Sequence, residues 1–123
     1  MTWTLMIDDE RFPSDEGVVL VRTCQEAIRE CIDRGLPTHL LLDHDLGMYW
    51  DHWDTESESY VKLTVIEFVV WLRDTLQIIH HHVDFCPVKT YHINSQNPVG
   101  AENIRNIFEY DIPHLTGWII EEI

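Results

Sequence analysis

The stretch from Leu40 to Gly47 constrains the fold of this chain more than any other. It begins with three consecutive leucines and ends in Asp43, His44 and Asp45. A short apolar run that stops abruptly at ionisable residues is typical of a strand buried on both faces of a parallel sheet. In open α/β sheets, ligands bind just outside the carboxyl ends of such strands. We therefore expect Asp43, His44 and Asp45 to lie where such a fold binds its ligand.

Two other apolar runs stop in the same way. One is Trp3–Ile7, which precedes Asp8 and Asp9, and the other is Val88–Ile93, which precedes the polar segment 94–100. If the three strands are neighbours, their polar ends converge at one edge of the sheet. The sequence therefore predicts one shared site rather than three separate turns.

The remaining patterns predict strands that alternate with helices. The expected elements are strands at 3–7, 18–21, 39–42, 88–93 and 115–120 and helices at 24–34, 59–79 and 101–110. Thr23 and Glu26 form the pattern of a capping box, Gly35 ends that helix, and Pro113 is expected to break the last one. Residues 48–59 are expected to form a long polar and aromatic loop.

This alternation indicates a single α/β domain over residues 1–123. We expect a three-layer, doubly wound parallel sheet of five strands in the order 2-1-3-4-5, because that order places the first, third and fourth strands side by side. The first crossover, residues 8–17, is too short for a full helix.

Charge and composition exclude several functions. The net charge is −14, which repels nucleic-acid phosphates and argues against non-specific nucleic-acid binding. Three cysteines without a CxxC pair suit a reducing cytosol. The apolar run 61–72 is interrupted by Lys62 and Glu67 and is too short to span a bilayer, and the N-terminus has no signal-like segment. We expect a soluble cytoplasmic protein that does not bind membranes.

The residue types at the strand ends suit a phosphorylated ligand. Clustered carboxylates ionise together at low cost only beside a cation, so Asp8, Asp9 and Asp43 are candidate ligands of a divalent metal ion, Mg²⁺ or Mn²⁺. Arg11 can form a fork to a phosphate. Neutral donors and the helix start after the fourth strand add anion-binding groups. The candidate ligand-binding residues of that segment are Asn94, Ser95, Asn97 and Gly100.

Each of these clusters also has a purely structural explanation. Asp8 and Asp9 fit a solvated turn, an aspartate after a strand often caps the next turn, and Asn-Pro-x-Gly is a common helix start. The aromatic segment poses the same choice. Trp50 and Trp53 can form a lid or a stacking platform for a base, or they can fold back onto the core.

Together the three motifs resemble one known family. Asp8–Pro13, Asp43–Gly47 and Asn94–Gly100, in this order and spacing, are similar to the signature of the cyclic-phosphate processing receiver-like domain. The resemblance covers nearly the whole chain and implies a flavodoxin-like fold. It also implies a role in hydrolysing or binding cyclic-phosphate nucleotides, in a family that includes many phage and bacterial proteins.

The chain departs from the pattern at one position that matters for catalysis. A histidine usually precedes the Ser-x-Asn-Pro element, whereas here Asn94 stands there and His92 lies two residues earlier. Positions 92 and 94 share a strand face, so His92 can substitute one pleat deeper. Residues 115–123 contain no lysine, although classical receivers need one after the fifth strand, and this disfavours a phosphoacceptor switch.

The leading hypothesis is a metal-dependent, phosphodiesterase-like hydrolase of a cyclic nucleotide or a 2′,3′-cyclic phosphate end. His44 or His92 would act as general acid or base, Arg11 and Ser95 would stabilise developing charge, and Asp45 would orient a histidine or bind the metal. If a phage encodes it, it would act on a host defence signal in the host cytoplasm. Two alternatives are a non-catalytic nucleotide-binding module and an acidic interaction protein that mimics DNA.

Overall fold

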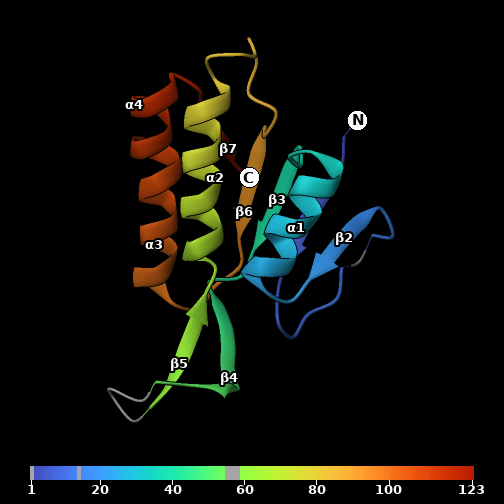
Figure 1. The fold of residues 1–123 in the computed structure, drawn as a ribbon, viewed down its shortest axis with the longest axis vertical. Helices are drawn as coiled ribbons and strands as arrows, with labels where there is room; N and C mark the ends of the chain where they lie inside the picture. The colour runs from blue at the N-terminus through green and yellow to red at the C-terminus, as the bar shows by residue number, and fades with distance from the viewer. Residues whose placement is uncertain (1, 14, 55–58) are drawn as a thin grey trace.

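The computed structural model describes residues 2–13, 15–54 and 59–123, and it describes side chains for 2–13, 15–44 and 64–123. A five-stranded parallel sheet forms the centre (Figure 1). Its strands, in spatial order, are β2 (Val18–Val21), β1 (Thr4–Ile7), β3 (His39–Leu42), β6 (Thr90–Ile93) and β7 (Glu121–Glu122). The predicted order 2-1-3-4-5 is therefore confirmed, with β6 and β7 as the fourth and fifth strands.

Helix α1 (Cys24–Arg34) has the predicted bounds because both of its ends are fixed by the sequence. The Thr23 hydroxyl accepts a hydrogen bond from the Glu26 backbone N–H at 3.1 Å, as a capping residue does. Gly35 ends the helix with a φ of +86°, a conformation that glycine adopts without strain. The described residues between β1 and β2 form no helix, in agreement with the short first crossover.

All described helices lie against one face of the sheet. Helices α1 and α2 (Ile66–Ile79) cross in front of the strands, and α3 (Pro98–Asn106) lies beside α2 (Figure 1). On this face Tyr91 stacks on Phe108, with ring centroids 4.0 Å apart, and burial raises the pKa of Tyr91 to about 12. The core-facing strand residues are Leu5, Ile7, Leu40, Leu42, Tyr91 and Ile93.

The opposite face of the sheet has no described helix over it. Its side chains come from the alternate strand positions, Thr4, Met6, Leu20, His39, Leu41, Thr90 and His92. Only Met6 among them is buried. The described part of the chain therefore builds two layers, a sheet and one helical layer, where three were expected.

Residues 45–64 differ from the prediction. The expected loop and the first turns of the expected long helix form an antiparallel hairpin of β4 (Asp45–Asp54) and β5 (Ser59–Thr64). Helix α2 begins only at Ile66. From Val61 the sequence Val-Lys-Leu-Thr alternates apolar and polar residues with period two, which suits a strand. The residues that follow are also mostly apolar, so the change from the strand period of two to the helical period of 3.6 is not evident in the sequence.

The C-terminal part of the chain also differs from the elements that the sequence predicted. Pro113 does not end the helical path, which runs from α3 through the π-helical turn η1 (Ile107–Asp111) into α4 (Ile112–Thr116). The proline is accommodated because it lies in the first turn of α4, where a missing N–H costs little. Gly117, with a φ of +77°, ends α4. The strand expected at 115–120 is therefore wrong in position, because the last strand of the sheet is β7, which begins only at Glu121.

The three cysteines, Cys24, Cys31 and Cys86, are buried and unbridged, as expected from their spacing. Burial raises the pKa of the Cys24 thiol to about 11 and that of Cys31 to about 12. These thiols are therefore protonated and unreactive near neutral pH. Among the described residues, no helix is both long enough and apolar enough to cross a membrane.

Candidate functional site

The carboxyl ends of β1, β3 and β6 lie in one row. The first polar residue after each strand continues the hydrogen-bond ladder of the sheet. The pairs are Asp8 N to Val21 O at 3.1 Å, Asp43 N to Ile7 O at 3.0 Å and Asn94 N to Leu42 O at 2.7 Å. Backbone bonds therefore place the side chains of Asp8, Asp43 and Asn94 at the same edge, as the sequence predicted.

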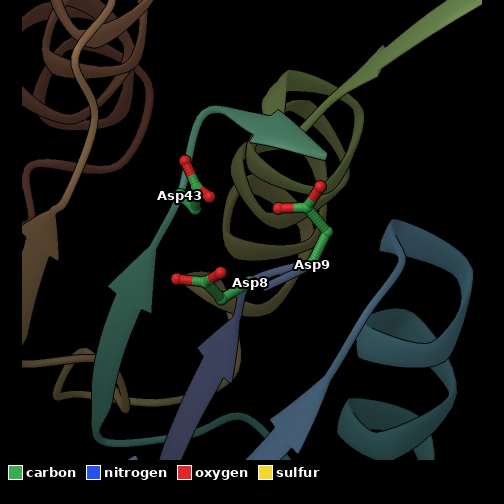
Figure 2. Close-up of side chains that lie close together, drawn as sticks. All are labelled: Asp8, Asp9 and Asp43. Atoms are coloured by element: carbon green, nitrogen blue, oxygen red, sulfur yellow. The ribbon is translucent and has the colours of Figure 1, made fainter. Parts of the chain in front are cut away.

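Three carboxylates gather at this edge. One oxygen from each of Asp8, Asp9 and Asp43 lies within 4.8 Å of the other two. Figure 2 shows the three side chains turned toward a common space, Asp8 and Asp9 from the end of β1 and Asp43 from the end of β3. Asp8 is only 2% exposed, whereas Asp9 and Asp43 are partly exposed. The expected cluster is thus present in the structure.

Asp8 also holds the turn after β1. Its Oδ1 accepts hydrogen bonds from the backbone N–H groups of Glu10 and Arg11, both at 2.9 Å. Its Oδ2 lies 3.6 Å from Nη1 of Arg11, a half-exposed cation. Nη1 of Arg22 donates to the Asp8 and Arg11 carbonyls, each at 3.0 Å. The turn explanation of Asp8 is therefore confirmed for one oxygen, while the other lies near Arg11, and the metal-binding role of Asp8 stays a prediction.

The segment after β6 is organised by its own side chains. Ser95 Oγ accepts from the Asn97 backbone N–H at 3.0 Å, and Asn97 Oδ1 accepts from the Gly100 N–H at 3.0 Å as the N-cap of α3. These bonds explain why Ser and Asn occur at positions 95 and 97 without invoking a ligand. The ligand-binding roles predicted for Ser95, Asn97 and Gly100 stay predictions.

His44 is packed beneath the start of α3. It is 7% exposed, and its carbonyl accepts from the Val65 backbone N–H at 2.9 Å. A Cβ atom added to Gly100 would lie 2.5 Å from three atoms of the His44 ring. Glycine is therefore required at position 100 because the imidazole occupies the space that any side chain would need.

His92 lies on the other side of the site from His44. It lines a small pocket of about 80 Å³ together with Asp8, Asp43 and Asn94. Its Nδ1 lies 2.7 Å from the Ile123 oxygen, and its side chain is exposed. Of the two histidines predicted as acid or base, His92 thus shares this pocket with two of the carboxylates, Asp8 and Asp43.

Sequence reasoning missed two apolar residues of this pocket, Met6 and Leu41, which form part of its wall. They lie two positions before Asp8 and Asp43, so the period of a strand would have assigned them to the same face. The predicted roles of Asp45, Trp50 and Trp53 fall on side chains outside the described residues, although their backbone belongs to β4.

A parallel sheet of this order, with acidic residues after its first and third strands, defines a receiver-like α/β protein. Residues 3–110 match the family model described as the cyclic-phosphate processing Receiver domain, and the chain belongs to this family. Comparison with curated proteins and with solved structures gave no match. The family links the chain to the processing of cyclic phosphates.

Proposed function

We propose that this protein hydrolyses the phosphodiester ring of a cyclic nucleotide or a 2′,3′-cyclic phosphate end. The observation that carries this proposal is the gathering of Asp8, Asp9 and Asp43 within 4.8 Å beside a pocket, in a family named for cyclic-phosphate processing. Such a cluster has the donor atoms of a phosphoryl-transfer site.

The donor set fits a hard divalent cation. Three carboxylates this close repel one another, and a cation with a preference for oxygen ligands offsets that repulsion. Asp8, Asp9 and Asp43 would hold Mg²⁺ or Mn²⁺. When bound, such an ion neutralises phosphate charge and polarises the phosphoryl group. It would also reverse the local field in a chain whose net charge of −14 repels anions.

The chain's own side chains supply the remaining functions. Arg11 is half-exposed beside Asp8 and can stabilise charge that develops on phosphate oxygens. Ser95 uses its oxygen to accept the Asn97 N–H, which leaves its hydroxyl proton for a phosphate oxygen. Asn94 lines the small pocket and offers an amide donor.

His92 is the proposed acid or base. In hydrolysis, the oxygen of water bonds to phosphorus, one ring P–O bond breaks, and the departing sugar oxygen takes up a proton. His92 lines the pocket, and an imidazole ring can both accept and donate a proton through its nitrogens, so it can move that proton. His44 is buried against Gly100 and is better suited to positioning the start of α3.

A panel of 2′,3′- and 3′,5′-cyclic nucleotides, each incubated with the protein and Mg²⁺ or Mn²⁺, tests this proposal. We expect at least one to give a ring-opened nucleoside monophosphate, detected by its ³¹P resonance, and EDTA to stop the reaction. Intact rings in every sample, with metal present and the protein folded, would contradict hydrolysis.

One observation favours a second candidate, a module that binds the nucleotide without cleaving it. Asn94 stands where the family pattern usually has a histidine, and an amide cannot act as a general acid or base. This candidate predicts that a cyclic nucleotide raises the melting temperature of the protein and is recovered unchanged. The same panel separates the two functions, because only the hydrolase forms product.

A further inference from the structure

The uncovered face of the sheet carries a groove that the proposed function does not yet use. Its volume is about 660 Å³, which is within the range of pockets that hold small molecules. Residues that line it include Met6, Phe12, His39, Leu41, Thr90 and Asn94. It therefore runs over the strand positions on the side opposite the described helices.

The groove opens beside the carboxylate pocket. Met6, Leu41 and Asn94 line both spaces, so the two are neighbours along the same face of β1, β3 and β6. Along the strands, the groove reaches from Asn94, which lies in the same row as Asp8 and Asp43, to Thr4, His39 and Thr90. This span is four residue steps, or roughly 13 Å at the usual rise of a strand. A ligand whose phosphate lies at the carboxylates can extend its remaining part along this face.

The lining of the groove suits a flat, partly apolar group. Its middle is formed by Met6 and Leu41, and its far end by the polar pair His39 and Thr90, with Nδ1 and Oγ1 2.6 Å apart. Phe12 also lines the groove and is 78% exposed, so its ring is accessible to a ligand.

Phe12 is contacted by a cation that is itself fixed. The guanidinium carbon of Arg22 lies 4.8 Å from the centre of the Phe12 ring, and Arg22 is itself fixed by bonds to the Asp8 and Arg11 carbonyls. The cation fixes the ring at the edge of the groove and the side chain stays exposed. An aromatic ring in this position is a stacking platform for a nucleobase.

We propose that this groove binds the base and ribose of the nucleotide. Phe12 stacks on the base, Met6 and Leu41 contact its apolar surface, and the His39–Thr90 pair meets a polar edge. This inference rests on the proposed function for the position of the phosphate. It places the base on the uncovered sheet face and not on Trp50 and Trp53.

The first test compares two ligands that share a cyclic phosphate but differ in the base. A cyclic nucleotide and glycerol 1,2-cyclic phosphate are titrated in the presence of Mg²⁺ against the protein with and without Phe12→Ala, both carrying His92→Ala so that the ring is not opened during the titration. We expect Phe12→Ala to weaken binding of the nucleotide by about 5- to 150-fold, the range for loss of one stacked base. Binding of the glycerol compound should not change.

Phe85→Ala is a matched control. Phe85 is also exposed, at 80%, and lies near a cation, with Lys89 Nζ 6.0 Å from its ring, but it does not line the groove. We expect this variant to bind both ligands as the wild type does. Equal losses for both ligands in Phe12→Ala, or no loss for either, would overturn the base site.

A second measurement decides the inference even if no cyclic phosphate binds. Phosphate-free nucleosides are added at millimolar concentration, and the methyl NMR signals of Met6 and Leu41 are followed. Shifts at both methyls that are lost in Phe12→Ala support the base site. Unchanged methyl signals with every nucleoside overturn it. Failure of the proposed function alone would instead appear as nucleoside binding without cyclic-phosphate binding or cleavage.

Discussion

Asp43→Asn is expected to lower the rate of cyclic-phosphate hydrolysis by about a thousandfold or more while the protein stays folded. The substitution removes one of the three charges within 4.8 Å and with it a carboxylate that would hold the cation. Loss of charge stabilisation at a phosphoryl group is worth several kcal/mol, and each 1.4 kcal/mol corresponds to roughly a factor of ten in rate. The fold should survive because position 43 is tied to β1 by its backbone N–H.

Asp33→Asn on the exposed face of α1 is the control, since it makes the same change of charge far from the strand ends. Single-turnover rates and melting temperatures are measured for both variants and the wild type. We expect Asp33→Asn to keep the wild-type rate. An Asp43→Asn variant that hydrolyses the ring at the wild-type rate would rule out the carboxylate cluster as the catalytic centre.

Gly100→Ala is expected to destabilise the protein by about 1–3 kcal/mol, because the new methyl group would overlap the His44 ring. The added Cβ would lie 2.5 Å from ring atoms, and His44 is buried and has little room to move. Alanine favours a helix over glycine by roughly 1 kcal/mol, which offsets only part of this cost. The measurement is the free energy of unfolding in denaturant.

A double-mutant cycle tests the cause of that loss. His44→Ala removes the ring that the new methyl group meets, so Gly100→Ala should cost less in the His44→Ala background than in the wild type. Gly17→Ala is the control, because among the described residues its Cβ would meet only Asp15 Oδ1, at an ordinary contact distance of 3.7 Å. Equal costs of Gly100→Ala in both backgrounds would show that the contact with His44 is not responsible.

The sequence predicted which strand-end residues lie close together better than it predicted the rest of the chain. The row of Asp8, Asp43 and Asn94 could be foreseen because each follows an apolar run, and the strand order follows from the α/β alternation. Helix α1 could be foreseen because Thr23 and Gly35 mark its ends chemically. In each case a local signal and the tertiary structure agree.

The missed features had no distinct signal in the sequence or depend on packing that only the folded chain shows. The β4–β5 hairpin and α2 share one apolar stretch, so the boundary between them is not visible in composition. The path through Pro113 depends on the π-helical turn before it. The packing of His44 against Gly100 joins positions 56 residues apart, and only the folded chain shows why position 100 lacks a side chain.

The central claim is that the carboxylate cluster brings a divalent cation and a cyclic phosphate together. The most direct measurement is the ³¹P linewidth of a cyclic nucleotide with a trace of Mn²⁺, with and without the protein. The spectra are recorded in the first minutes of the reaction, while the ring is still intact. We predict that wild-type protein broadens the ³¹P signal strongly and that Asp8→Asn/Asp43→Asn does not, because the paramagnetic ion and the phosphate share one site. Equal linewidths with the wild type and the double variant would contradict the account.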